Sequence, residues 1–374
     1  MDPHIESIRT QNNLTYFRLR GANVSLANAL RRVILAEIPC VVLRSETKDP
    51  ADITIDVNTS RLNNELIRQR LSCVPVHIQD TTFSVEDHAV ELDVENASDS
   101  ILMVTSGNFK IKNTQTDTYL TPEAVAAIFP RSPITGDYID LVRLRPAQSR
   151  GAREAIRLQC RLGVATASEN AAYSVACTCA YGATTDQAAA DEAWKSREAE
   201  LKQAGSTSDV LEGARADWEM LGAKRYTIPD SFDFVLESVG QFTNDQLVVK
   251  AIDVITSKLE KFAMLEEGRV AIGPAPGTME NAFLVTLRGE GYTLGKLVEY
   301  ALFSRHYEGQ PGSDGSLVYC GFDKPHPHID EARIRVAFKQ PVAAEALPVL
   351  LREATAKLVA AFESLGMSFQ QSAQ

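Results

Sequence analysis

Residues 14–38 read LTYFRLRGANVSLANALRRVILAEI and contain the most informative local pattern of the chain. Residues 14–20 have the aromatic and β-branched content typical of a strand, and a glycine ends the run. A helix is predicted next, because apolar residues recur every four positions from Leu26 to Ile38 and Pro39 stops the pattern. Ser25 is the expected N-cap of this helix. The stretch therefore predicts a strand, a turn and an amphipathic helix.

A second copy of the same unit lies later in the chain. Residues 283–302 read FLVTLRGEGYTLGKLVEYAL, which again predicts a strand, a glycine turn and a helix, with Thr293 as the N-cap. The copies align without a gap, because the Leu-Arg-Gly at 19–21 coincides with that at 287–289. Leucine spacing alone is common to core-facing helices. The shared tripeptide and the matching caps favour duplication over coincidence.

Each copy is followed by strand-like sequence and a long amphipathic helix. In the first half the strand-like run is 232–236, and the apolar stripe of the helix covers 247–262. In the second half the corresponding segments are 334–338 and 347–365. Both halves therefore predict the order strand, helix, strands, helix.

The halves differ in what is inserted between these elements. Many short strand-like runs separate Pro39 from the strand around Cys177, so the first half is expected to carry an extra domain. Residues 183–224 are rich in alanine and acidic residues and predict a solvated helical excursion. Residues 268–277, which end in Gly-Pro-Ala-Pro-Gly, are the expected linker.

Composition excludes several classes of protein. With 374 residues, 44% of them hydrophobic, the chain is long enough for two or three packed domains. A net charge of −11 argues against a protein that coats nucleic acid, because phosphate binding depends on clustered lysine and arginine. No run approaches the roughly 18 apolar residues of a membrane span, and no secretory signal is recognisable. An intracellular protein with no membrane contact is expected.

The six cysteines form neither a disulfide framework nor a paired C-x-x-C zinc pattern, so reduced thiols are expected. Cys177 and Cys179 would share one face of a strand. A buried apolar pair is favoured there over a metal site.

The helix at 26–39, LANALRRVILAEIP, closely resembles the signature helix of the RNA polymerase alpha family. This family includes the bacterial alpha, the archaeal D and the eukaryotic third subunits. Residues 58–71, NTSRLNNELIRQRL, with Val-Pro-Val at 74–76, are similar to the start of the family's inserted domain. Further similar stretches are VTSG at 104–107 and PITGDYI at 133–139.

The second half resembles the small partner subunit, archaeal L or the eukaryotic eleventh subunit. GYTLGKL at 291–297, YCGF at 319–322 and PHP at 325–327 carry this resemblance. The two families normally occur as separate chains that form a heterodimer. The resemblance therefore implies a fused pair, an arrangement similar to the polymerases of large nucleocytoplasmic DNA viruses.

The implied fold is α+β, with two alpha-type dimerisation domains that form an intramolecular pseudo-dimer, the first interrupted by a mainly β inserted domain. The expected boundaries are 1–47 with 176–265 for the first dimerisation domain, 48–175 for the inserted domain, 266–280 for the linker and 281–374 for the second dimerisation domain. The signature helices and the long terminal helices are expected to pack about a pseudo-twofold axis. The apolar residues expected at this interface are Leu26, Leu30, Ile34, Leu294, Leu297, Val298 and Leu302.

Arg31 and Arg32, together with Asn28 and Glu37, are expected to face the large catalytic subunits, as the resemblance implies. A guanidinium suits this role because it offers five donors in a fixed fork to carboxylates and carbonyls. Two consecutive arginines more often form a solvated helix face. The surrounding motif favours the interface. In the second copy their counterparts are a glutamate and a tyrosine, so only the first copy keeps the pair.

No metal or other cofactor is expected. Many relatives carry a cysteine-rich metal or iron–sulfur loop in the inserted region, and this sequence has no such cluster there. A separate departure is that residues 163–175 lack the histidine and tryptophan of the corresponding family run, so the contacts that the family makes there are not carried over. His326, His328 and Asp330 resemble metal ligands on paper, but without a fourth ligand a turn is favoured.

No catalytic residue is expected, because the sequence has no phosphate loop, no G-x-S-x-G and no aspartate cluster for two magnesium ions. The resemblance implies a non-catalytic assembly-platform subunit of a multisubunit DNA-directed RNA polymerase, which docks the second-largest subunit and then the largest. Small polymerase subunits are further expected partners, and DNA is contacted only through the complex. The expected location is the virion and host cytoplasm for a viral protein, or otherwise the nucleus. Two rival functions are a scaffold of the same fold outside transcription and an enzyme that uses the 326–330 cluster.

Overall fold

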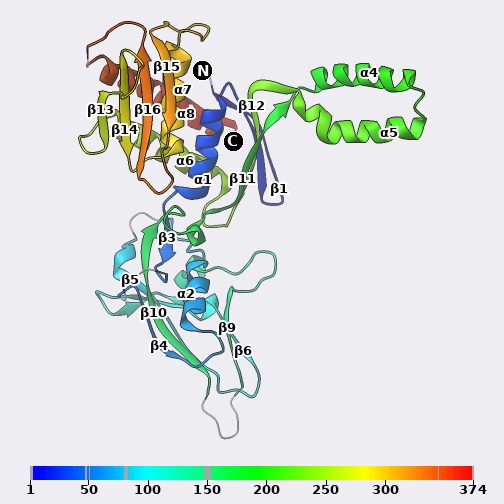
Figure 1. The fold of residues 1–374 in the computed structure, drawn as a ribbon. Coiled ribbons are helices and arrows are strands. Elements are labelled where there is room, and N and C mark those ends of the chain that lie inside the picture. Colours follow the sequence, from blue (N-terminus) through cyan, green and yellow to red (C-terminus); the bar gives the residue numbers. More distant parts are fainter. Residues whose placement is uncertain are drawn as a thin grey trace. The chain divides into compact units, whose positions relative to one another are not determined.

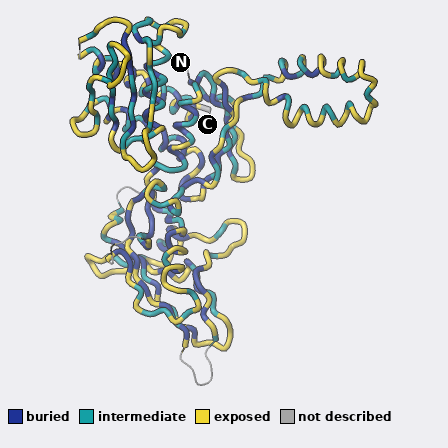
Figure 2. Tube along the Cα trace, in the orientation of Figure 1, coloured by how far each residue is buried: buried dark blue, intermediate teal, exposed yellow. Residues whose placement is uncertain are grey.

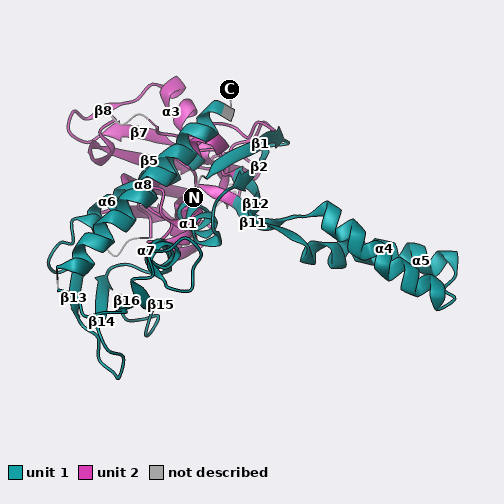
Figure 3. Ribbon diagram, turned by 90° about the horizontal axis from the view of Figure 1, so that it is seen from above, with its two compact units in different colours: residues 1–33, 178–237, 248–374 teal, residues 34–177, 238–247 magenta. Residues whose placement is uncertain are grey.

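The computed structural model describes residues 3–46, 49, 51–79, 83–146, 153–343 and 345–372. The chain forms two compact units, which Figure 3 draws in different colours. Unit 1 holds residues 1–33, 178–237 and 248–374, and unit 2 holds residues 34–177 and 238–247.

Unit 1 contains two four-stranded sheets with helices against them (Figure 1). The first sheet has the strand order β1-β2-β12-β11 and the second has the order β13-β14-β16-β15. The strands are β1 (His4–Gln11), β2 (Leu14–Arg20), β11 (Ala176–Thr185), β12 (Thr227–Ser238), β13 (Val270–Pro274), β14 (Ala282–Arg288), β15 (Leu317–Asp323) and β16 (Glu331–Phe338). The helices wholly or mainly in this unit are α1 (Val24–Ala36), α4 (Gln187–Gln203), α5 (Ser208–Asp217), α6 (Asn244–Ala263), α7 (Tyr292–His306) and α8 (Ala346–Ser372).

The two sheets share their register as well as their strand order. Arg20 pairs with Ser231 where β2 meets β12, and the aligned Arg288 pairs with Glu331 where β14 meets β16. Side chains alternate between the two faces of a strand, so equal register places equivalent residues on the core side. The predicted duplication is therefore present in the backbone, and the mixed helix-and-sheet class is confirmed.

Both predicted helix caps are wrong by two positions. Helix α1 starts at Val24, and the carboxamide oxygen of Asn23 accepts the backbone N–H of Ser25 at 2.9 Å, so Ser25 lies inside the first turn. Helix α7 follows Gly291, which has no side chain to cap with, and Thr293 lies in the first turn. Each prediction placed the cap immediately before the apolar run, whereas each helix begins earlier in the sequence, at Val24 and at Tyr292.

The segment expected as a linker contains a strand. Strand β13 pairs antiparallel with β14, and Val270 lies opposite Leu287. Val270 and Ile272 alternate with smaller residues as a strand requires, and Pro274 is tolerated because β13 is the edge of its sheet. The junction between the two copies is therefore shorter than residues 266–280.

The helical excursion predicted over residues 183–224 is formed by α4 and α5, which extend from the ends of β11 and β12 (Figure 1). Exposed residues run along both helices in Figure 2. The base is closed by Trp218, whose ring lies 5.9 Å from those of Trp194 and Tyr226. One turn of π-helix, Trp218–Gly222, leads back towards β12.

Unit 2 is mainly β and includes residues 48–175, which the sequence predicts to be a separate inserted domain. A six-stranded sheet follows the order β3-β10-β5-β7-β8, with β4 also paired to β10, and β6 and β9 form a separate pair. Its core contains Leu43, Leu92, Ile111, Ile156 and Leu162, all buried. The elements are β3 (Cys40–Leu43), β4 (Ile53–Asn58), α2 (Asn64–Ser72), β5 (His88–Glu95), β6 (Leu102–Thr105), β7 (Lys110–Asn113), β8 (Thr118–Tyr119), α3 (Pro122–Ile128), β9 (Asp140–Leu144), β10 (Ala155–Ala165) and the short 3-10 segments Val85–Asp87, Ser106–Asn108 and Ala171–Tyr173.

Among the described residues, no helix combines the length and the apolar character that a membrane crossing would need.

Candidate functional site

Helices α1 and α7 carry the residues that the sequence assigns to the pseudo-dimer interface. All of these residues are buried, because they lie on the apolar stripe that each helix turns towards its sheet and its neighbours. They are Leu26, Leu30, Ile34, Leu294, Leu297, Val298 and Leu302. Burial alone does not distinguish an interface between the copies from the core of each copy. Direct contacts between residues of the two copies make that distinction.

One such contact joins the two helices directly. Arg32 on α1 donates from Nε to the Thr293 hydroxyl on α7, at 3.0 Å. The Thr293 side chain is buried, whereas Arg32 is exposed, so the bond closes the rim of the contact between the copies. This is one of two arginines predicted to face other subunits. Since a guanidinium has five donors, four remain for a partner.

Arg31 is held within its own helix. Its Nε and Nη2 atoms both donate to the Asn28 side-chain oxygen, at 3.1 and 2.9 Å. Residues three apart on a helix are neighbours, and this bond fixes the direction of the guanidinium. The structure therefore brings Asn28, Arg31 and Arg32 together on α1. Glu37, the fourth predicted residue, is half-buried just after the helix ends.

The second copy has a different pair of side chains at these positions. Lys296 and Glu299 occupy the positions of Asn28 and Arg31, and they form an ion pair at 2.6 Å. Glu299 also accepts the backbone N–H of Phe322 at 2.9 Å, which ties α7 to β15. The equivalent faces of the two helices thus differ in charge: α1 presents arginines and α7 presents a neutralised pair.

Gly295 allows this arrangement. A Cβ atom on Gly295 would lie within 2.3 Å of two atoms of the Phe322 ring, so the ring packs directly on the helix backbone. The Lys296 ammonium lies 5.6 Å from the centre of the same ring, and Tyr292 lies 5.2 Å from it. Only glycine at position 295 therefore allows the Phe322 ring to pack this closely on α7.

The last helix of the second copy covers the sheet of the first copy. Phe369 on α8 meets Phe17 on β2 edge to face, with ring centres 5.6 Å apart, and Phe17 stacks on Phe234 at 4.8 Å. The Ser368 hydroxyl accepts the backbone N–H of Ile5 on β1 at 3.0 Å. Sequence reasoning missed Phe369 and Ser368. The apolar stripe of α8 does continue from Leu365 to Phe369 at a spacing of four, which was the available signal.

The long helix of the first copy, α6, likewise contacts the second copy. Lys258 on α6, a first-copy helix, forms an ion pair at 3.1 Å with Glu290, which follows β14 of the second copy. Arg352 on α8 donates to the backbone oxygen of Ala263 at the end of α6, at 3.3 Å. Each copy therefore supplies its long terminal helix to the other copy.

Comparison with known proteins identifies the family of the chain. The sequence profile of the RNA polymerase Rpb3/Rpb11 dimerisation domain matches residues 16–259. The chain belongs to this family.

Three relatives of this Rpb3/Rpb11-type chain are named as polymerase subunits. It is 25% identical over 295 residues to DNA-directed RNA polymerases IV and V subunit 3B of Arabidopsis thaliana, which covers 69% of this chain and 89% of the relative. It is 38% identical over 74 residues to DNA-directed RNA polymerases II, IV and V subunit 3 of the same plant, which covers 20% and 21%. It is 31% identical over 107 residues to subunit Rpo3 of Pyrococcus horikoshii, which covers 27% and 38%. Beyond the first of these, the chain spans well under half of each relative's length.

The profile match of the Rpb3/Rpb11-type chain stops inside α6. It thus covers the first copy from within β2 onward, together with the residues of unit 2, and the second copy begins after it. The shared strand order and register are what relate the second copy to the first.

The histidine cluster of the second copy forms a turn before β16. The His326 and His328 rings meet edge to face at 5.1 Å, and His326 Nδ1 accepts the backbone N–H of His328 at 3.1 Å. Asp330 contributes its backbone oxygen to the N–H of Gly289. In the described part of the chain, no group of three or more His, Cys, Asp or Glu residues is placed to hold a metal ion.

Burial suppresses the reactivity of four cysteines. It raises the pKa of Cys40, Cys160, Cys179 and Cys320 to about 12, so these thiols stay protonated at neutral pH. Cys177 and Cys179, predicted to form a buried apolar pair, differ in burial: Cys179 is buried and Cys177 is exposed.

Proposed function

We propose that this chain is a non-catalytic assembly platform that docks the two largest subunits of a multisubunit DNA-directed RNA polymerase. The observation that carries the proposal is the asymmetry of α1 and α7. The two copies are equivalent in fold and exchange their terminal helices, but only α1 presents Arg31 and Arg32. A symmetric pair of copies would offer the same surface twice, whereas this pair offers one cationic face to one set of partners.

We propose further that the second copy is the small partner subunit fused to the first. Fusion replaces an encounter between two chains with an intramolecular one, at an effective concentration on the order of millimolar for a short flexible connection. The domain assignment is then 1–47 with 176–265, an inserted domain over 48–175, and a second dimerisation domain that includes β13. Small polymerase subunits complete the proposed complex. This chain would contact DNA only indirectly, through that complex. A viral setting, with the virion and host cytoplasm as the location, follows only from the resemblance to fused viral subunits.

Co-purification tests the docking. The tagged full chain is expressed with the two largest subunits of its own polymerase, and both are expected to be retained. Arg31→Glu combined with Arg32→Glu should abolish their retention, because charge reversal replaces donors with carboxylates at the docking face.

Two controls make the result specific. Arg305→Glu reverses an exposed charge on α7 and should retain both subunits. Thr293→Val removes the intramolecular acceptor of Arg32 without changing charge, and it should also retain them. If the unaltered chain retains neither subunit, a scaffold outside transcription becomes the better interpretation.

A further inference from the structure

Unit 2 contains a cleft of about 550 Å³ whose lining is unusually basic for an acidic protein. It lies between the loop before α2, the end of α2, and the two-stranded sheet of β6 and β9. Four of its nine lining residues are arginines and one is a carboxylate, Asp140. The lining residues are Arg61, Leu62, Arg70, Ile101, Met103, Asp140, Val142, Arg143 and Arg145.

Two of the four arginines already make hydrogen bonds within the unit. Arg145 donates from its backbone N–H to Glu154 at 2.6 Å and its guanidinium pairs with the same carboxylate. Arg70 donates from Nη1 to the backbone oxygen of Leu141, at 2.8 Å. These contacts fix both guanidinium groups against the wall of the cleft.

The other two arginines have unused donors. Arg61 and Arg143 are exposed, and within the described residues neither side chain makes a hydrogen bond or an ion pair. The charge of Arg61 does reach Glu154, where it adds to the hydrogen bonds of Arg145 in lowering the pKa of that carboxyl. An excess of positive charge is therefore left at the mouth of the cleft.

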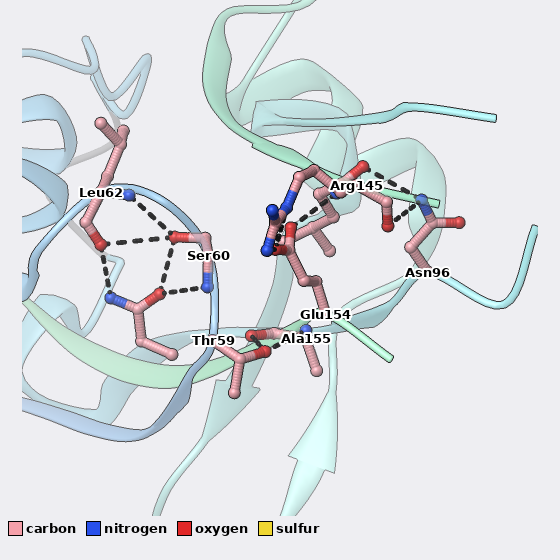
Figure 4. Close-up of polar contacts among 9 residues, drawn as sticks. Thr59, Ser60, Leu62, Asn96, Arg145, Glu154 and Ala155 are labelled. Carbon is pink, nitrogen blue, oxygen red and sulfur yellow. Dashed lines mark hydrogen bonds and ion pairs between the residues drawn. The ribbon is translucent and has the colours of Figure 1, made fainter. Parts of the chain in front are cut away.

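The loops around the cleft are held by a network of hydrogen bonds, which Figure 4 shows. Asn96 donates to the backbone oxygens of Leu144 and Arg145, at 3.0 and 2.9 Å, and Thr59 bonds to the backbone of Ala155. The Ser60 hydroxyl interacts with the Leu62 backbone. A frame fixed in this way reduces the entropy lost when a ligand binds.

The floor of the cleft is apolar. The Ile101 side chain is 64% exposed, and Leu62 and Met103 are half-buried beside it. An exposed isoleucine among arginines is complementary to an apolar side chain of a ligand whose neighbouring residues are acidic.

We propose that this cleft binds an acidic polypeptide segment of a partner protein, with an apolar side chain on Ile101 and Met103 and carboxylates on Arg61 and Arg143. Guanidinium groups bind carboxylates through two parallel hydrogen bonds, which gives both affinity and direction. This inference goes beyond the assembly role, because it concerns unit 2 and does not use Arg31 or Arg32.

Nucleic acid fits the cleft less well. None of the described lining residues is aromatic, so bases have no ring on which to stack. The apolar residues Leu62, Ile101 and Met103 also offer no contact to a phosphate backbone, whereas they can pack against an apolar side chain of a peptide.

Fluorescence anisotropy with the full chain tests the proposal. The probe is a short labelled peptide of alternating Asp and Glu residues around a central Leu-Phe, and a second probe has Ser-Ser at the centre. The first peptide is expected to bind, more weakly as salt rises, and the second to bind several-fold more weakly. The double variant Arg61→Glu, Arg143→Glu should weaken binding by about tenfold or more, and Ile101→Ser should weaken binding of the first peptide only.

The matched control is Arg161→Glu, which reverses an exposed arginine of the same unit outside the cleft and should bind as the unaltered chain does. Arg61 and Arg143 are exposed, so the variants should unfold thermally as the unaltered chain does. Three results would each overturn the proposal: no binding of the first peptide, equal loss in the Arg161→Glu variant, or stronger binding of an oligothymidylate than of the peptide.

Discussion

Arg32 and Thr293 are joined by a hydrogen bond from Nε to Oγ1 at 3.0 Å, although 261 positions separate them in the sequence. The bond links the equivalent helices of the two copies near the residues that the family resemblance assigns to other subunits. The same side chain thus helps to hold the copies together and remains exposed for a partner.

Removing this acceptor should weaken the contact between the copies. Thr293→Val keeps the shape of the side chain but not the hydroxyl, and we expect it to lower the free energy of unfolding by about 1 kcal/mol. Urea unfolding of Thr293→Val, Arg32→Ala and the double variant checks this. Because both single substitutions remove the same bond, the double variant should lose less stability than the sum of the two, and strictly additive effects would mean that the bond contributes nothing.

The end of α8 should contribute strongly to stability, because Phe369 is 1% exposed and packs on Phe17. Phe369→Ala is expected to cost about 3 kcal/mol or more, as large-to-small substitutions of buried aromatic residues do. Met367→Ala is the control on the same helix turn, since Met367 is 58% exposed and should change stability by less than about 0.5 kcal/mol. Equal effects of the two substitutions, measured by urea unfolding, would argue against the packing of α8 on the first sheet.

Two helical glycines should respond in opposite directions to alanine. A Cβ on Gly366 would lie 3.6 Å from Ile252, an ordinary contact, so Gly366→Ala should stabilise the protein by about 0.5–1 kcal/mol through helix propensity. A Cβ on Gly295 would overlap the Phe322 ring. Gly295→Ala should therefore lower stability by roughly 1 kcal/mol despite the same gain in propensity. The melting temperature should rise in Gly366→Ala and fall in Gly295→Ala relative to the unaltered chain.

Glu154 should make stability depend on pH. The backbone N–H and guanidinium of Arg145 hold its pKa below the ordinary value of 4.5. A carboxyl with a lowered native pKa contributes stability that is present above its unfolded pKa and is lost as pH falls through the native pKa. Glu154→Gln should therefore be less stable than the unaltered chain at neutral pH, and the difference should shrink below about pH 4.5.

The control for this pH dependence is Glu95→Gln. Glu95 pairs with Arg153 at 2.8 Å, but both side chains are more than half exposed, so its loss should change stability little. A difference between Glu154→Gln and the unaltered chain that does not vary with pH would contradict the assigned role of the carboxylate.

The sequence predicts local elements of this fold well and contacts between distant segments poorly. The strand and helix of each copy follow from the period of their apolar residues, and the duplication follows from the shared Leu-Arg-Gly at 19–21 and 287–289. The caps were misplaced because Asn23 and Gly291 precede the apolar run that was used to place them. Strand β13 was missed because glycine and proline around it are typical of a linker as well as of an edge strand.

The exchange of terminal helices could not be predicted from periodicity. An apolar stripe on α8 shows that the helix is covered, but not which sheet covers it. Phe369 and Phe17 lie at opposite ends of the chain, and only the packed structure brings them together. The same holds for Arg61 and Arg143, which are inconspicuous in the sequence and share a cleft in unit 2.

The mass of the complex with the second-largest polymerase subunit shows whether one chain acts as a complete pseudo-dimeric platform. Size-exclusion chromatography with light scattering should give one copy of this chain for each copy of that subunit, because one chain already supplies both halves of the pseudo-dimer. Two copies of this chain in the complex, or no complex at all, would contradict the account.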